Sequence, residues 1–264
     1  MKNTEQSVKY WNENGFINYQ LFTAEEVEEV KIELMRLLEE RDGDPHIFYE
    51  HPHKNSELCL NIVKDNRIVE MVMKLMANDL NIPDCKIEAT QTWAYFKAPG
   101  SLGRDVHQNI FYSQANAGEV INISIAIDDH DKENGCVYYY PGSHKELICY
   151  PIPDSSHTEF ASKDEERMKT NPPGQSNERG KPLYVPGTWV NGKWTDKYPK
   201  VYPTCKAGTV SILNSHVLHG SHENKSKDRW RMALLIQYQK LGNSDKKLYS
   251  PGTHMKREKI DVYN

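Results

Sequence analysis

Three short segments of the sequence hold the side chains best suited to catalysis. His107 and Asn109 are two residues apart, so they point to the same side of an extended segment. The stretch 215–222 adds three imidazoles, and Arg231 follows it. Two histidines and one oxygen ligand on one face of a β-barrel form the facial triad of non-heme iron(II) oxygenases, which leaves positions open for a cosubstrate and O₂. A chain with 11 histidines also produces such clusters by chance, so the surrounding elements must bring the right ones together.

Helical patterns dominate the first part of the chain. Thr23 and Glu26 have the spacing of a capping box, and the apolar residues that follow recur at helical spacing. This pattern predicts a helix over 24–40. The same periodicity predicts a second helix over 66–79, and a shorter one before Gly15.

From residue 86 onward, β-branched and aromatic residues alternate in the way that is typical of an antiparallel sheet. The strand predicted over 87–97 has one functionalised face, made of Gln91, Trp93, Tyr95 and Lys97. The strand predicted over 120–127 places its isoleucines on one face. Its other face carries Asn122, Ser124 and Ala126, and we expect that smaller, polar face to line a cavity.

Three further strands are expected. Glu133-Asn134-Gly135 has the Asn-Gly signature of a hairpin turn, which leads into Val137–Tyr140. Alternation sends the neighbouring tyrosines of this run to opposite faces, so at most part of the trio lines a pocket. The last two strands are predicted over Thr209–Leu213 and Arg231–Tyr238.

Composition and charge exclude several classes of protein. The chain has 264 residues and a net charge of −4, so it lacks the basic excess that nucleic-acid binding requires. No run approaches the roughly 18 apolar residues of a membrane span, and the N-terminus lacks a secretory signal. The five cysteines form no CxxC pair, which indicates reduced thiols. We therefore expect a cytoplasmic protein with no nucleic-acid or membrane partner.

The organisation predicted along the chain is a single domain over 1–264. No linker divides the sequence into regions of different composition. The segment 150–204 is rich in Pro, Ser and Lys and has few apolar runs. Long loops of this kind are usually lids or substrate loops, so we expect 150–204 to be an insertion of that type.

Several short segments occur in the order of a known family along nearly the whole chain. They are Tyr10–Phe22 followed by the helix after Thr23, Lys97-Ala98-Pro99-Gly100, Ile125–Asp129, Glu133-Asn134-Gly135-Cys136, Pro141-Gly142-Ser143-His144-Lys145, and His219-Gly220-Ser221 with Asn224 and Ser226. In these segments the chain resembles the phytanoyl-CoA dioxygenase family of iron(II)/2-oxoglutarate oxygenases. The resemblance implies a mainly β fold with flanking helices. Its core would be a double-stranded β-helix, of the jelly-roll or cupin-like kind, with N-terminal helices packed on one sheet.

The resemblance also assigns roles to individual residues. His107 and His219 would be iron ligands, and Asn109 would occupy the third ligand position. Arg231 would clamp the distal carboxylate of 2-oxoglutarate through a bidentate pair, with Ser221 adding a hydroxyl. Two side chains of the 87–97 strand would complete the cosubstrate site, namely Lys97 and Tyr95.

Four other residues near these positions are less suited to bind the metal or the cosubstrate. Arg229 is a rival for the role of Arg231. His216 and His222 are not expected to be ligands. His144 is expected to be structural, because the turn in which it lies needs side-chain hydrogen bonds.

One position departs from the family pattern. The family has His-x-Asp, whereas this chain reads His107-Gln108-Asn109. An aspartate donates a hard oxygen and neutralises one charge on iron(II), while an asparagine amide is a neutral and weaker donor. We therefore expect a lower metal affinity. The chain also has Ser124 where many relatives place a tryptophan, so that wall of the cosubstrate pocket must be built differently.

Three explanations of Asn109 compete. It is an engineered replacement of aspartate, or the mark of a natural protein that binds a ligand without catalysis, or a ligand in a working enzyme that uses the amide or an exogenous ion. Iron halogenases on related barrels have a small residue there, and Asn109 would fill that space. Asp105 is a further candidate carboxylate, although its strand parity suits packing or a salt bridge better.

The function implied is a 2-oxoglutarate-dependent dioxygenase that hydroxylates, or otherwise oxidises, a small and polar metabolite. Its cofactors would be Fe(II) and the cosubstrates 2-oxoglutarate and O₂. The substrate-binding candidates are Gln91, Trp93 and Asn122, with Trp189 and Trp194 of the insertion as lid aromatics. The alternative is a catalytically silent barrel that binds a metabolite or a partner.

Overall fold

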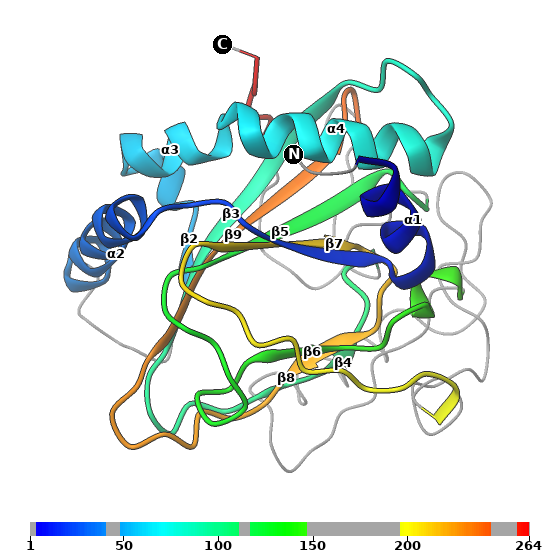
Figure 1. Cartoon of the computed structure of the whole chain (residues 1–264). Coiled ribbons are helices and arrows are strands. Elements are labelled where there is room, and N and C mark those ends of the chain that lie inside the picture. The colour runs from blue at the N-terminus through cyan, green and yellow to red at the C-terminus, as the bar shows by residue number, and fades with distance from the viewer. Residues whose placement is uncertain (1–3, 41–47, 111–116, 147–195, 244–257, 264) are drawn as a thin grey trace, which may run out of the picture.

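Two β-sheets face each other, and a layer of helices covers the outer face of the larger sheet (Figure 1). The computed structural model describes residues 4–40, 48–110, 117–146, 196–243 and 258–263. The helices are α1 (Thr4–Asn14), α2 (Ala24–Glu39), α3 (Glu57–Val63) and α4 (Asn66–Leu80), with 3₁₀ turns at Pro52–Lys54 and Ser143–Lys145. The three helices predicted from periodicity are therefore confirmed, with ends that differ by a residue or so.

The larger sheet has six strands in the order β1-β7-β5-β9-β3-β2, and the smaller has three in the order β4-β8-β6. The strands of the larger sheet are β1 (Phe16–Gln20), β2 (Tyr49–Glu50), β3 (Ile87–Lys97), β5 (Val120–Ala126), β7 (Thr209–Asn214) and β9 (Arg231–Lys240). Those of the smaller sheet are β4 (Arg104–His107), β6 (Val137–Tyr139) and β8 (His219–Ser221). Every pairing is antiparallel, as the alternating sequence pattern predicts.

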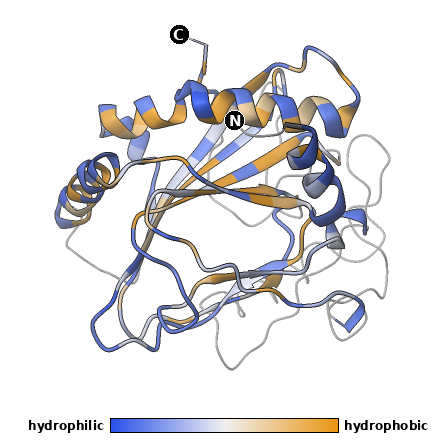
Figure 2. Cartoon of the chain, in the orientation of Figure 1, coloured by the Kyte–Doolittle hydropathy of each residue, from blue (hydrophilic) through white to orange (hydrophobic). Residues whose placement is uncertain are grey.

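Helix α2 begins where the capping box predicts. The Thr23 hydroxyl accepts from the Glu26 amide at 3.2 Å, and the Glu26 carboxylate accepts from the Thr23 amide at 2.7 Å. Both amides lie at the helix start and have no partner within the helix, so this exchange satisfies them. The helices carry hydrophobic and hydrophilic residues together (Figure 2), and the apolar ones are buried.

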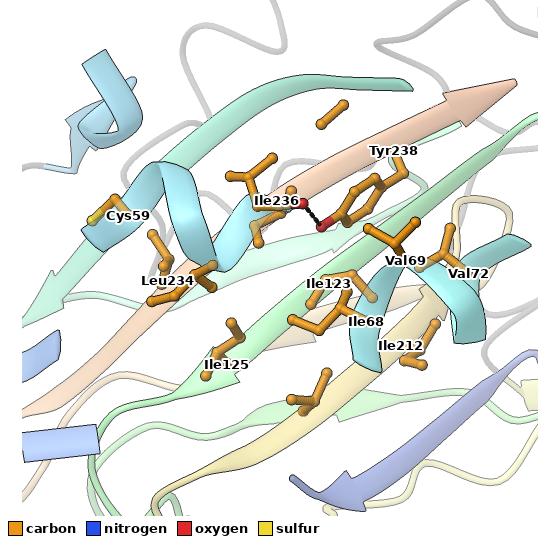
Figure 3. Packing of buried hydrophobic residues seen from close by; sticks show 14 of the residues in the cluster. Cys59, Ile68, Val69, Val72, Ile123, Ile125, Ile212, Leu234, Ile236 and Tyr238 are labelled. Atoms are coloured by element: carbon orange, nitrogen blue, oxygen red, sulfur yellow. Dashed lines mark hydrogen bonds between the residues drawn. The ribbon is translucent and has the colours of Figure 1, made fainter. Parts of the chain in front are cut away.

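The main core lies between the helices and the outer face of the larger sheet. The residues that meet there include Ile123 and Ile125 of β5, Ile212 of β7, Leu234 and Ile236 of β9, and Ile68, Val69 and Val72 of α4 (Figure 3). Burying each such side chain contributes about 1.5–3 kcal/mol. The Tyr238 hydroxyl, which enters this core, donates to the Val63 carbonyl at 2.8 Å. Because the odd and even residues of a strand face opposite sides, the polar residues of β5 and β9 are turned toward the smaller sheet.

A buried carboxylate joins α1, α4 and the larger sheet. Asp79 accepts from the Trp11 indole at 2.7 Å and from the Asn214 amide at 3.0 Å. Burial raises the pKa of the Asp79 carboxyl. These hydrogen bonds hold the N-terminal helix against the end of β7.

The predicted Asn-Gly hairpin is wrong. The turn at Glu133-Asn134-Gly135 follows β5 of the larger sheet and precedes β6 of the smaller one, so it crosses between sheets. Both edges of β5 are already paired, with β7 and β9, which leaves no edge for a hairpin partner. The Asn134 amide instead donates to the Asp129 and Trp230 carbonyls, at 2.7 and 3.1 Å, and ties the crossing to the start of β9.

Several expectations fall on residues outside the described ranges. The structure describes only 196–204 of the predicted insertion over 150–204, and Trp189 and Trp194 lie outside. Of the five cysteines, the four that are described are buried free thiols. A search of the helices in the described ranges finds none with the length and apolar character needed to cross a membrane.

Gly15, between α1 and β1, has a positive φ of 77° in a crowded place. A Cβ built on it would lie 2.5 Å from His144 Nδ1 and 2.5 Å from Val217 Cγ2. Gly100 has a similar φ of 85°, but a Cβ there would meet nothing within 4 Å. A substitution at Gly100 would therefore cause backbone strain alone, whereas one at Gly15 would cause both strain and a steric clash.

We expect Gly15→Ala to lower the free energy of unfolding by about 3 kcal/mol, from left-handed strain of ~1–2 kcal/mol and overpacking of ~1–3 kcal/mol. Gly100→Ala is the matched control and should cost only the strain. Urea unfolding of both variants measures the difference. Equal losses would show that His144 and Val217 do not crowd this position.

Candidate functional site

A cavity of about 100 Å³ lies between the inner faces of the two sheets. Strands of both sheets contribute to its wall, so residues from distant parts of the chain meet there. The predicted site residues among those lining it are Tyr95, His107, Asn109, Asn122, His219, Ser221 and Arg231. The sequence indicated ten site residues, and the structure brings seven of them together around this cavity. The other three, Lys97, Gln91 and Trp93, are not among the described lining residues.

His107 and His219 form the centre of the cavity wall. His107 is the last residue of β4 and His219 the first of β8, and the two are directly paired across these antiparallel strands. Their ring centres lie 4.3 Å apart, with the planes tilted by 49°. Two imidazoles that bind one metal ion through bonds of about 2.1 Å, with a right angle between the two bonds, have ring centres about 4.5 Å apart. The pair therefore fits one shared metal ion.

A backbone hydrogen bond orients the His219 ring. Its Nδ1 lies 2.9 Å from the Val217 carbonyl, so this nitrogen carries the proton as a donor and Nε2 keeps a lone pair for a ligand. Burial lowers the pKa of the His219 imidazole to about 4. The ring is consequently neutral near pH 7, as a metal ligand must be.

Asn109 lies just beyond β4 and lines the same cavity as His107. Gln108, between them, is fully buried, and its amide donates to the His216 carbonyl at 2.8 Å. No group of three His, Cys, Asp or Glu residues that could hold a metal occurs in the part of the chain that the structure describes. The side chain of Asp105 lies outside that part. A metal ion held by His107, His219 and Asn109 would have two imidazoles and one neutral amide oxygen as donors, a set that can bind a metal but supplies no negative charge.

Arg231, the first residue of β9, is only 5% exposed and lines the cavity. Burial lowers the pKa of its guanidinium. Its Nε has no hydrogen-bond partner among the described residues, and none of their carboxylates forms an ion pair with it. Arg229 differs, because it is paired at 2.6 Å with Asp131 and at 2.6 Å with Glu133, away from the cavity. The geometry thus favours Arg231 over its rival as an anion clamp.

Ser221 connects the cavity to its supporting strands. Its hydroxyl oxygen accepts from the Lys97 ammonium at 3.1 Å and from the Arg104 amide at 3.2 Å, which leaves its own proton available to a ligand. Lys97 also donates to the His222 carbonyl. Lys97 is not among the described residues that line the cavity, so it supports β8 from behind rather than facing a ligand.

The predicted substrate residues are placed unequally. Asn122 lines the cavity, where its amide donates to the Ser215 hydroxyl at 2.7 Å and its oxygen accepts from Gln237 at 3.2 Å. Gln91 and Trp93 lie on the same strand as Tyr95 but are not among the described lining residues. A role for these two stays a prediction.

Sequence reasoning missed three polar residues that line the cavity. Tyr139 stacks on Phe16 with ring centres 4.6 Å apart, and strand alternation could have identified it as the inward member of the tyrosine trio. Ser211 also lines the cavity, beside the already noted Ser124. Arg104 had no sequence signal, because the pairing of β4 with β8 decides where it lies.

Comparisons with known proteins bear on the family and the fold of the chain. The family model described as "Phytanoyl-CoA dioxygenase (PhyH)" matches residues 11–233. An ectoine dioxygenase of Nocardia farcinica is 22% identical over 239 residues, 83% of this chain and 72% of that protein. The dioxygenase lolE1 of Epichloe uncinata is 43% identical over 143 residues, 54% of this chain and 42% of that protein. The chain thus spans less than half the length of the latter relative.

A solved structure is similar over almost the whole chain. EctD from S. alaskensis, crystallised with 2-oxoglutarate and 5-hydroxyectoine, superposes with a TM-score of 0.68 at 18% identity, covering 97% of this chain and 82% of that chain. The predicted double-stranded β-helix with helices packed on one sheet is confirmed.

We expect Asn109→Asp to raise the affinity for iron(II) by about 10- to 100-fold, because a carboxylate beside the two imidazoles adds a negative charge to the donor set. Anaerobic competition with a colorimetric chelator measures the change. Asn122→Asp adds the same charge to the cavity from another strand and is the matched control. If both variants gain equally, the effect is a general one of cavity charge, and Asn109 is not at a ligand position.

Proposed function

Because the chain belongs to the phytanoyl-CoA dioxygenase family of 2-oxoglutarate-dependent enzymes, we propose that it oxidises a small, polar molecule in the cavity between its two sheets. The cosubstrate would be 2-oxoglutarate and the metal iron(II). Hydroxylation is the outcome that the family resemblance favours.

One observation carries this proposal, namely the buried guanidinium of Arg231. Removing a charged group from water is costly unless a partner of opposite charge compensates. Arg231 lines the cavity and forms no ion pair with the described carboxylates. The distal carboxylate of 2-oxoglutarate would supply that partner through two parallel hydrogen bonds, and the Ser221 proton would add a third.

The other residues divide the remaining tasks. His107, His219 and the Asn109 amide oxygen would hold the metal at the opposite end of the cosubstrate from its clamp. Iron(II) bound there would supply the O₂ chemistry that couples decarboxylation of 2-oxoglutarate to oxidation of the substrate. Val137, Leu213 and Leu235 form apolar parts of the wall and exclude water from the reacting groups.

A polar substrate is supported by the hydrogen-bonded wall beside the histidines. The buried Asn122 of β5 lines the cavity, and the buried Gln237 of β9 donates to its amide oxygen at 3.2 Å. An amide group in a cavity wall fixes the orientation of a polar ligand through hydrogen bonds. The relative named for ectoine is likewise named for a small polar molecule.

The second candidate function is a barrel that binds a metabolite without oxidising it. Asn109 favours it, since the neutral amide weakens the metal site. The two functions share the cosubstrate clamp and differ in turnover, so release of succinate in air distinguishes them.

An anaerobic titration with iron(II) and 2-oxoglutarate tests the proposal. We expect a weak visible metal-to-ligand charge-transfer band, followed by succinate release when air is admitted. Arg231→Gln should weaken 2-oxoglutarate binding by about 100-fold, since it removes a charge-assisted bidentate pair of roughly 3 kcal/mol.

Arg229→Gln removes an equivalent charge from outside the cavity and is the matched control, which should bind normally. A band without succinate would favour the silent barrel. The absence of 2-oxoglutarate binding under every condition, including in an Asn109→Asp variant, would overturn the proposal.

A further inference from the structure

The turn between β7 and β8 holds both segments that carry the downstream and the amide candidates for metal binding. Three successive carbonyl groups of this turn, at residues 215–217, each accept one hydrogen bond from such a segment. The donors are the Ile110 amide at 2.9 Å, the Gln108 side chain at 2.8 Å and Nδ1 of His219 at 2.9 Å. The first two donors are the neighbours of Asn109. The course of this one turn therefore sets where Asn109 and the His219 ring lie.

Asn214, the last residue of β7, shapes the turn. Its side-chain oxygen accepts from the His216 amide at 2.9 Å, and its backbone carbonyl accepts from the Val217 amide at 2.9 Å. An asparagine side chain that bonds to the backbone two residues later forms an Asx-turn, which fixes the local course of the chain. The turn keeps this shape only while the oxygen of the Asn214 amide, and not its nitrogen, faces His216.

Asp79 of α4 decides which way that amide faces. Its carboxylate accepts from the Asn214 side-chain nitrogen at 3.0 Å, from the Trp11 indole at 2.7 Å and from the Asn78 side chain at 3.3 Å. Burial raises the pKa of the Asp79 carboxyl, and the three N–H donors oppose that effect by stabilising the ionised form. An ionised carboxylate only accepts hydrogen bonds. The nitrogen of Asn214 must therefore point to Asp79, and its oxygen is left for His216.

Asp79 itself is not among the described residues that line the cavity. It belongs to the helical layer, whereas the cavity lies between the two sheets. A chain of hydrogen bonds connects the two, running from Asp79 to Asn214 and into the turn. From the turn it reaches the His219 ring and both neighbours of Asn109. Residues that hold metal ligands from outside in this way typically contribute 10- to 100-fold to metal affinity.

We propose that Asp79 and Asn214 are positioning residues for the metal site. Asp79 sets the orientation of the Asn214 amide, and the turn that this amide shapes orients His219 and Asn109. The inference rests on the proposed function for the premise that His219 and Asn109 bind iron(II).

An exchange of the two side chains tests this inference. In Asp79→Asn, the new amide oxygen accepts from Trp11, so the new amide nitrogen is turned toward Asn214. Asn214 must then flip to accept that bond, and its own nitrogen faces the His216 amide, so that two donors meet. The further change Asn214→Asp restores an acceptor for both, because a carboxylate accepts from residue 79 and from His216 alike.

The first measurement is made on the metal-free full chain. Long-range proton–nitrogen correlation spectra of the imidazoles show which nitrogen of His219 carries the proton, and a His219→Gln variant assigns the signal. We expect the Nδ1-protonated form in the native chain, a mixture of the two forms in Asp79→Asn, and the Nδ1-protonated form again in the double variant Asp79→Asn/Asn214→Asp.

The second measurement is the affinity for iron(II), from anaerobic competition with a colorimetric chelator. Asp79→Asn should bind iron(II) about 10- to 100-fold more weakly than the native chain, and the double variant should recover most of that loss. Thermal melting identifies any variant that fails to fold.

Tyr238→Phe is the matched control. It removes another hydrogen bond between the helices and the larger sheet, the one that the Tyr238 hydroxyl donates to the Val63 carbonyl at 2.8 Å. This variant should be less stable than the native chain, with the His219 tautomer and the iron(II) affinity unchanged.

The outcomes separate this inference from the proposed function. A His219 ring that keeps its Nδ1 proton in a folded Asp79→Asn variant would overturn the inference and leave the proposed function standing. An equal change in Tyr238→Phe, or a folded double variant that regains neither property, would also overturn it. A native chain that binds no iron(II), while its metal-free variants show the expected tautomers, would overturn the proposed function and support the positioning of His219.

Discussion

The site depends on the antiparallel pairing of two very short strands, β4 and β8. This pairing places His107 directly opposite His219 and Arg104 opposite Ser221, so it brings together both proposed histidine ligands and part of the proposed cosubstrate site. The strands approach closely because residue 220 is glycine. A Cβ there would collide with the Tyr138 hydroxyl and lie 2.7 Å from the Arg104 carbonyl. Lys97, buried beneath β8, then holds Ser221 and the His222 carbonyl in place.

The larger sheet makes such a polar interior possible. Its outer face buries isoleucine, leucine and valine side chains against α4 and the neighbouring helices, which stabilises the strands from one side (Figure 3). The inner face is therefore free to carry groups that contribute little to the core, such as Asn122, Ser124, Ser211 and Arg231. Stability and chemistry are divided between the two faces of the same strands.

Electrostatics distinguish this cavity from what the family pattern leads one to expect. A His-x-Asp site has a fixed negative charge beside the metal, whereas here the charged groups among the described lining residues are Arg104 and Arg231. We expect such a cavity to hold a divalent cation less tightly than a His-x-Asp site does, because each positive charge in a partly dry cavity acts on the others with little screening.

The sequence by itself determined the elements whose signals are local. The capping box at Thr23 and the apolar periodicity specify the helices, and alternation specifies which face of β3 and β5 is polar. Only the tertiary structure decided which distant segments meet. Strands as short as β4 and β8 carry too few residues for a periodic signal, and the choice of Arg231 over Arg229 depends on burial rather than spacing. The tertiary structure likewise decided the crossing at Asn134 and the position of Arg104. A strand pairs with whichever sheet edge is free, and no local run of residues encodes which edge that is.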